Sequence, residues 1–241
     1  MHYRAFIGSL IYPLSTRVDL SFAVHNLANF SANAGKVHCE GLVHLLRYIR
    51  DNKTLGLKYY VDMNDAPVTD LLRKANIKTK NHLMDFSDSS LQDCPDTRRS
   101  TGAYIIFYQG GPIDHGTHVP GPVAKSIAES EYNAACTAGM ALAHSRMLIR
   151  GLLNEDPDMV PKEAPLIVLD RKSDMCMAKN GKDTKHTRHI ASRMNFVRNV
   201  EKCQMHKIDW CERGMQLADI GTKNLSEPDL TPRMKYIMAR L

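Results

Sequence analysis

The chain has 241 residues and 43% of them are hydrophobic, which is enough for one large domain or two small ones with a buried core. Lysine and arginine outnumber aspartate and glutamate by 32 to 26, and the formal net charge of +6 suits a polyanionic partner such as nucleic acid. The 6 cysteines include no CxxC pair, and the histidine pairs lack partner ligands at zinc-finger spacing. Neither a disulfide framework nor a structural zinc site is therefore indicated.

The sequence shows no signal-peptide pattern and no apolar run approaching the roughly 20 residues that a membrane-spanning helix needs. Its scattered cysteines fit the reduced thiols of the cytosol or the nucleus. We therefore expect a soluble intracellular protein, cytoplasmic or nuclear, that has no membrane partner.

Residues 1–61 are expected to be mainly helical and to end in a strand. One apolar stripe with the helical spacing i, i+3, i+4, i+7 consists of Leu42, Leu45, Leu46 and Ile49, and a similar stripe runs from Val18 to Phe30. Residues 56–61 are rich in aromatic side chains and predict a strand. Residues 62–80 are polar with weak periodicity and predict a linker, which places a domain boundary there.

Residues 81–241 alternate between strand and helix patterns and predict an α/β domain, a mixed sheet with helices on its faces. A long helix is expected around residues 132–148, and short helical stretches at 214–222 and 228–240. The strands are expected at residues 83–89, 103–109, 122–128, 164–170 and 206–211. A turn at residues 109–112, with the sequence QGGP, separates the second strand from the third.

Four acidic residues come from four different elements of this second part. Asp88 and Asp170 end predicted strands, where aspartate is uncommon, Glu131 opens the long helix, and Asp219 lies in a short helical stretch. If they meet, their mutual repulsion and desolvation require a cationic partner, which a pair of divalent ions would supply. Magnesium prefers such oxygen ligands, and a two-metal site suits phosphodiester hydrolysis.

Each acid also has a simpler interpretation. An aspartate at a strand end commonly forms a turn or caps the next helix, as Asp170 would before residues 171–180. Glu131 would fit a helix start through the helix dipole, and Asp219 would fit a solvated helix surface. The chain has no GxSxG, CxxC or P-loop motif that would indicate another chemistry.

Seven blocks follow in order the C-terminal part of copia-type LTR-retrotransposon Pol polyproteins, and the chain resembles this family over nearly its whole length. They are YRAFIGSLIYPLSTRVDLSFAV, HLLRYIRDNKTLGLKYY, DFSDSSLQDCPDTRRSTGAYI, GGPI, AESEYNAA, TRHIASRMNFVR and QLADIGTKNL. The resemblance implies that residues 1–61 are the thumb and connection end of a reverse transcriptase. Residues 81–241 are implied to be a ribonuclease H-like domain, a mixed sheet flanked by helices.

The resemblance also implies an endonuclease that hydrolyses the RNA strand of RNA–DNA hybrids with two Mg²⁺ ions, for which Mn²⁺ is expected to substitute. Its four catalytic and metal-binding carboxylates fall on Asp88, Glu131, Asp170 and Asp219. The motif selects Glu131 over Glu129, a choice that helical periodicity leaves open because residues two apart point about 200° from each other. Where the family has a small polar residue after the third acid, this chain has Arg171, which could compete with a metal for Asp170.

Basic residues mark two candidate nucleic-acid contacts. Residues 183–202 carry Lys185, Arg188, Arg193 and Arg198, which could line a phosphate backbone or simply form a solvated helix face. Arg98 and Arg99 lie close to Asp88 in sequence. Two alternatives to an active nuclease remain: an inactive nucleic-acid-binding retrotransposon remnant, and an accessory subunit of a complete polymerase, since the chain has no YxDD motif of its own.

Overall fold

The computed structural model describes residues 2–79, 82–94, 96–121, 123–153, 163–171 and 191–240. Among these residues, no helix combines the length and the apolar character that crossing a membrane would require.

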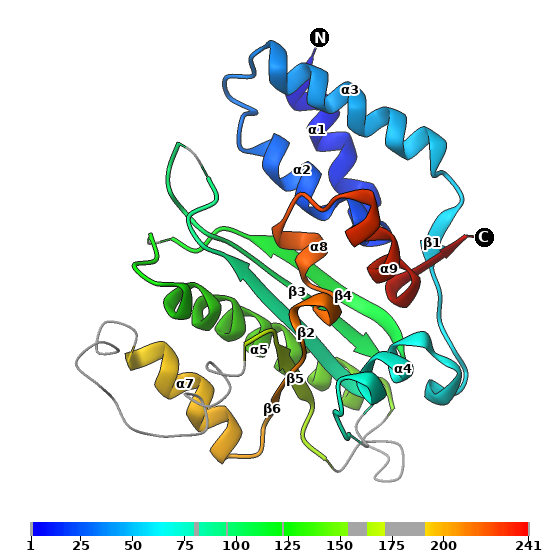
Figure 1. Cartoon of the computed structure of the whole chain (residues 1–241), viewed down its shortest axis with the longest axis vertical. Coiled ribbons are helices and arrows are strands. Elements are labelled where there is room, and N and C mark those ends of the chain that lie inside the picture. Colours follow the sequence, from blue (N-terminus) through cyan, green and yellow to red (C-terminus); the bar gives the residue numbers. More distant parts are fainter. Residues whose placement is uncertain are drawn as a thin grey trace.

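A mixed sheet with the strand order β4-β3-β2-β5-β6 forms the centre of the molecule (Figure 1). The strands are β2 (Leu83–Ser90), β3 (Thr101–Tyr108), β4 (Gly111–His118), β5 (Leu166–Leu169) and β6 (Lys207–Trp210). The first three are antiparallel neighbours, whereas β5 runs parallel to β2 and β6 runs parallel to β5. This arrangement is the ribonuclease H-like sheet, so the expected fold class is confirmed.

Helices cover both faces of the sheet because its strands carry buried side chains on both sides. On one face, Leu83, Ile106 and Ile167 of the strands form a core with the helices α5 (Ile127–Leu152) and α7 (Ala191–Lys202). These strand residues point to one side because side chains alternate along a strand. The opposite face packs against one helix that precedes β2 and two helices from the C-terminal end of the chain. These are α4 (Pro67–Lys74), α8 (Asp219–Thr222) and α9 (Glu227–Ile237).

The N-terminal part forms a helical layer with a core of its own. It contains α1 (Tyr3–Ile11), α2 (Ser21–Ala28) and α3 (Lys36–Asp51), together with the short 3₁₀ turns η1 (Tyr12–Ser15) and η2 (Val18–Leu20). The strand β1 (Leu55–Leu57) then pairs antiparallel with β7 (Met238–Arg240), near the other end of the chain. Two further 3₁₀ turns are η3 (Met63–Asp65) and η5 (Arg213–Met215).

The strand expected at residues 122–128 is wrong, because the third strand of the sheet is β4 at 111–118. Its sequence GPIDHGTH has few β-branched residues, a composition that an edge strand tolerates. The two-residue turn that precedes β4 places it beside β3. Gln109 and Gly110 form this turn with φ of 52° and 76°, as a type I′ hairpin turn requires. Residues 123–126 instead lead into α5, which begins at Ile127.

The expected linker at 62–80 contains α4, whose Val68, Leu71 and Leu72 are buried in the core beneath the sheet. The sequence pattern does not predict this helix, because only three of its eight residues are buried apolar side chains and the flanking residues are polar. The strand expected at 56–61 is shorter and ends at Leu57.

His115 on β4 attaches the N-terminal helices to the sheet. Its Nε2 lies 2.6 Å from the carbonyl oxygen of Leu14, and its Nδ1 lies 3.1 Å from Oγ of Ser21. A carbonyl only accepts, so Nε2–H donates to Leu14 and Nδ1 accepts from the hydroxyl of Ser21. Burial lowers the pKa of His115, which favours this neutral form.

Replacing His115 with alanine is expected to loosen this attachment at a cost of about 1–3 kcal/mol, because two partly buried hydrogen-bonding groups lose their partner. Hydrogen exchange should become faster in α1 and α2 and stay unchanged in β2 and β3. The exposed His44→Ala variant is the control. Unchanged exchange in α1 and α2 of His115→Ala would contradict the attachment.

Candidate active site

Asp88 and Asp170 lie side by side because β2 and β5 are neighbouring strands whose register places the two acids on the same face of the sheet. Phe86 on β2 pairs with Val168 on β5, and both pack into the core on the same face of the sheet. Alternation brings the side chains two positions further along, Asp88 and Asp170, onto that face again. Since β2 and β5 are parallel, their carboxyl ends bring both acids to one edge of the sheet.

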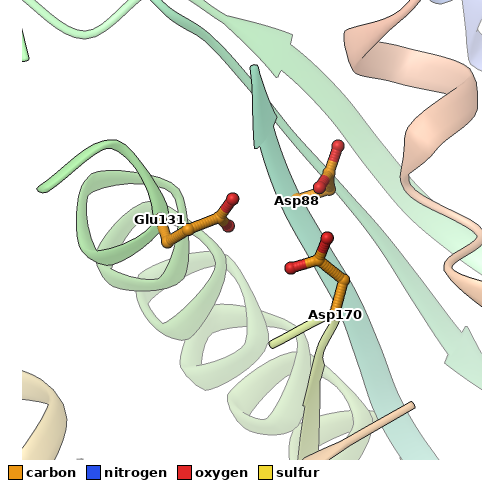
Figure 2. Close-up of side chains that lie close together, drawn as sticks. All are labelled: Asp88, Glu131 and Asp170. Atoms are coloured by element: carbon orange, nitrogen blue, oxygen red, sulfur yellow. The ribbon is translucent and has the colours of Figure 1, made fainter. Parts of the chain in front are cut away.

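Glu131 reaches the same edge from the first turns of α5. The helix begins after Ser126, whose Oγ accepts a hydrogen bond of 3.1 Å from the amide of Glu129. The carboxylate of Glu129 accepts from the amide of Lys125 at 2.7 Å, so Glu129 belongs to the helix cap. Figure 2 shows the side chain of Glu131 pointing toward Asp88 and Asp170.

The three carboxylates form a compact buried cluster. One oxygen from each of Asp88, Glu131 and Asp170 lies within 4.8 Å of the other two. Asp88 has 0% of its surface exposed and Glu131 has 4%, and Asp170 is half-buried. Among the described residues, Oδ1 of Asp88 and Oδ1 of Asp170 have no hydrogen-bond partner.

Burial shifts the ionisation of these acids. Desolvation raises the pKa of Asp88 to about 7, although Lys223 counteracts it, and desolvation also raises the pKa of Asp170. The positive charges of Lys223 and Arg171 partly offset this rise in the pKa of Asp170. A buried group of carboxylates in which Oδ1 of Asp88 and Oδ1 of Asp170 lack a partner fits a bound divalent cation, which would favour the charged forms of the acids.

Asp219 lies beside the cluster, but its carboxylate is bound to two basic side chains. Its Oδ2 accepts from Nη2 of Arg233 at 2.8 Å, and its Oδ1 accepts from Nζ of Lys223. The same Nζ lies 3.0 Å from Oδ2 of Asp88, and so Lys223 connects the two acids. Oδ2 of Asp88 also accepts from the hydroxyl of Thr222. The structure therefore brings together all four acids predicted from the sequence, three as a cluster and Asp219 through Lys223.

The close approach of α8 to the sheet depends on two residues. A Cβ atom at Gly221 would lie 2.6 Å from the Cβ of Ala103, the strand residue that pairs with Asp88. Gln216 is buried and its side-chain amide donates to the carbonyl oxygens of Ser87 and Val168, at 2.9 and 3.3 Å. Together they hold Asp219 and Lys223 against the ends of β2 and β5.

Sequence reasoning missed Lys223, Arg233 and Gln216. Lys223 follows Asp219 by four positions, a spacing at which opposite charges meet on a helix, and this signal could have identified it. The segment SIAE at 126–129 likewise matches a capping box, which would have assigned Glu129 to the cap and left Glu131 for the site. No local signal marks Arg233 or Gln216.

The basic residues predicted to bind nucleic acid have different surroundings. Arg98 and Arg99 are exposed in the connection between β2 and β3, and Arg193 lies at the start of α7 with its guanidinium 3.9 Å from Glu129. Arg198 is only 5% exposed and donates to Asn195, so its interpretation as a surface contact is corrected: it faces inward on α7. Lys185 and Arg188 lie outside the described residues.

Comparisons with known proteins identify the relatives of this chain. No family model matches it. The retrovirus-related Pol polyprotein from transposon TNT 1-94 of Nicotiana tabacum is 26% identical over 239 residues, and that from transposon RE1 of Arabidopsis thaliana is 27% identical over 224 residues. The homologues of this chain are Pol polyproteins of copia-type transposons. The two alignments cover 99% and 93% of the chain, but the chain spans only 16% and 14% of these Pol polyproteins.

Among solved structures, LC11-RNase H1, isolated from compost, is similar to this chain, with a TM-score of 0.44 and 12% sequence identity. The match covers 59% of this chain and 93% of that chain. The ribonuclease H-like class rests on the strand order and helix layers of the chain itself. Homology to Pol polyproteins agrees with the resemblance that the seven sequence blocks indicate.

Proposed function

We propose that the chain is the ribonuclease H part of a retrotransposon reverse transcriptase, an endonuclease that hydrolyses the RNA strand of RNA–DNA hybrids. The observation that carries this proposal is the cluster of Asp88, Glu131 and Asp170, in which three elements far apart in sequence place carboxylate oxygens within 4.8 Å of one another. Homology to Pol polyproteins supports the choice of substrate. Residues 1–61 are proposed to be the thumb and connection end of the reverse transcriptase, joined through 62–80 to the ribonuclease H domain at 81–241.

Asp88, Glu131 and Asp170 are proposed to hold divalent ions, with Asp219 completing the set. Two Mg²⁺ ions, or Mn²⁺ in their place, supply Lewis-acid stabilisation of the negative charge on a phosphodiester when bound. The buried position of Asp88 and Glu131 excludes bulk water from one side of the site and keeps their carboxylates in fixed positions. Lys223 holds Asp88 and Asp219 together and offers a positive charge at the rim for a substrate phosphate.

The partner that this proposal requires is an RNA–DNA hybrid, and the rest of a reverse transcriptase is a further proposed partner. The exposed Arg98 and Arg99 and the partly exposed Arg193 are basic groups that could contact the phosphate backbone without reading its sequence. An intracellular location, cytoplasmic or nuclear, is proposed because the hybrid is made and consumed inside the cell.

Purified protein is expected to cleave the RNA strand of a labelled hybrid in the presence of Mg²⁺ or Mn²⁺ and to leave the DNA strand intact. The Asp88→Asn variant keeps the size of the side chain and removes its charge, and it should show at most about one hundredth of the wild-type rate. Product lengths on a denaturing gel give both measurements. Equal rates for the wild type and Asp88→Asn would reject the nuclease function.

A second candidate is a protein that binds nucleic acid without cleaving it. It is favoured by Lys223 and Arg233, which already neutralise part of the charge of Asp88 and Asp219 without any metal. Salt-sensitive binding of hybrids, with no cleavage and no effect of Mg²⁺ on the melting temperature, would support this function instead.

A further inference from the structure

Lys223 holds its ammonium group inside the carboxylate site. The residue follows α8 directly, and its backbone amide donates to the carbonyl oxygen of Asp219 at 3.0 Å. Its side chain is only 24% exposed, although lysine normally extends its charged end into water. Nζ of Lys223 donates to Oδ2 of Asp88 at 3.0 Å and to Oδ1 of Asp219. A cation that belongs to the chain therefore lies between two of the four acids.

The two carboxylate oxygens of Asp88 have different surroundings. Oδ2 accepts from Nζ of Lys223 and from the hydroxyl of Thr222, whereas Oδ1 has no hydrogen-bond partner among the described residues. Oδ1 of Asp170 also has none within that part of the chain. Figure 2 shows Asp88 and Asp170 next to Glu131, with the three side chains pointing toward one another. The unpartnered oxygens thus belong to the three-acid cluster, and buried charged oxygens of this kind favour a bound cation.

Asp219 is neutralised on both of its oxygens. Oδ1 accepts from Nζ of Lys223, and Oδ2 accepts from Nη2 of Arg233 at 2.8 Å. The guanidinium of Arg233 also donates to three backbone carbonyl oxygens, which fix its position. A divalent ion between Asp88 and Asp219 would need the two oxygens that Lys223 contacts. The ion and the ammonium group therefore compete for one place.

The charges of the buried groups match one divalent ion. The four acids carry four negative charges when ionised, and the side chains of Lys223 and Arg233, 24% and 10% exposed, carry two positive charges. Two negative charges remain, which a single divalent ion neutralises. A second ion beside Lys223 would leave an excess of positive charge in a buried region, which is unfavourable. Arg171 is half-buried and Arg213 is exposed, so water screens their charges.

We propose that Lys223 takes the place of the second divalent ion in the substrate-free protein, which therefore holds a single ion at Asp88, Glu131 and Asp170. This inference rests on the proposed nuclease function and concerns the metal requirement of the same site. Without any metal, Lys223 keeps Asp88 and Asp219 together despite their like charges. Because a phosphodiester adds negative charge, Lys223 is expected to yield its place to the second ion only in the complex with the hybrid.

The test counts the Mn²⁺ ions bound per chain by electron paramagnetic resonance, which detects the free ion, on the whole protein without nucleic acid. The wild type is expected to bind one ion, and Asp88→Asn gives the background from acids elsewhere. Lys223→Met removes the ammonium group and keeps most of the side chain, so it should bind two ions, with the affinity for the second raised at least about tenfold. Lys53→Met makes the same change at an exposed position outside the site and should bind one.

Melting temperatures separate this role of Lys223 from ordinary packing. In EDTA, Lys223→Met should melt at a lower temperature than the wild type, because Asp88 and Asp219 lose the cation that they share. Excess Mn²⁺ should remove most of this difference, since ions bound to the folded state replace the lost charge. Lys223→Arg keeps the positive charge and should bind one ion. A loss of folding or stability in Lys223→Met that Mn²⁺ does not restore would overturn the proposal.

The counts distinguish failure of this proposal from failure of the nuclease function. Two ions of similar affinity in the wild type would overturn the proposal and leave the nuclease function intact, whereas no bound ion would overturn both. One ion in both the wild type and Lys223→Met would also overturn it, because Lys223 would then not be what limits the count. One ion in the wild type and in Lys223→Arg, with two in Lys223→Met, supports the proposal.

Discussion

Glu131→Gln is expected to reduce cleavage of RNA–DNA hybrids by more than about a hundredfold, whereas Glu129→Gln should leave most of the activity in place. Both glutamates are buried, and both lie in the first turns of α5. Only Glu131 contributes an oxygen to the cluster with Asp88 and Asp170. An amide at 131 loses the negative charge that a divalent ion requires of its ligands.

The Glu129→Gln variant is the matched control because it makes the same chemical change two positions away. Glu129 accepts from the amide of Lys125 at 2.7 Å and lies 3.9 Å from Arg193. Glutamine keeps an oxygen that can accept from Lys125 and loses only the charge that faces Arg193, so the replacement should lower stability by about 1 kcal/mol or less. Single-turnover cleavage rates and urea denaturation of both variants separate the two roles. Comparable losses of activity in both variants would contradict the assignment of Glu131.

The stability of the metal-free protein is expected to fall as pH rises from about 4 to 7. Desolvation raises the pKa of Asp88 to about 7 from its ordinary value of 3.8, so the folded state binds this proton more tightly than the unfolded state. The stabilisation from the protonated form is complete below the unfolded pKa and is lost as pH rises through the folded pKa. The loss amounts to roughly 2–4 kcal/mol for Asp88, and the pKa of Asp170 is shifted in the same direction.

Urea denaturation with EDTA at a series of pH values measures this dependence, and Asp88→Asn is the reference because its side chain does not titrate. The difference in the free energy of unfolding between the wild type and Asp88→Asn should change with pH in EDTA. Excess Mg²⁺ should reduce that change, since a bound cation favours the ionised carboxylates and stabilises the folded state. Parallel curves for the two proteins, with and without Mg²⁺, would show that Asp88 is neither desolvated nor a ligand.

Side-chain periodicity predicted most of the helices and strands because each of them carries its own apolar pattern. The long helix around 132–148 became α5, and the strands at 83–89 and 103–109 became β2 and β3. The same approach misplaced β4, since an edge strand with glycine, proline and histidine has no such pattern and depends on its hairpin partner. Periodicity also missed α4, because this helix is buried only by packing against the face of the sheet that carries Phe86 and Val168.

The amino-acid sequence by itself determined which acids end strands and open helices, and its motifs indicated the resemblance to Pol polyproteins that the comparisons also found. Only the tertiary structure decided that Asp88 and Asp170 lie at one edge, because that requires β2 and β5 to be parallel neighbours in one register. It also decided that Arg198 faces inward and that Lys223 connects Asp88 with Asp219. Periodicity fixes the direction of a side chain relative to its own element, whereas the distance between two side chains depends on how the elements pack.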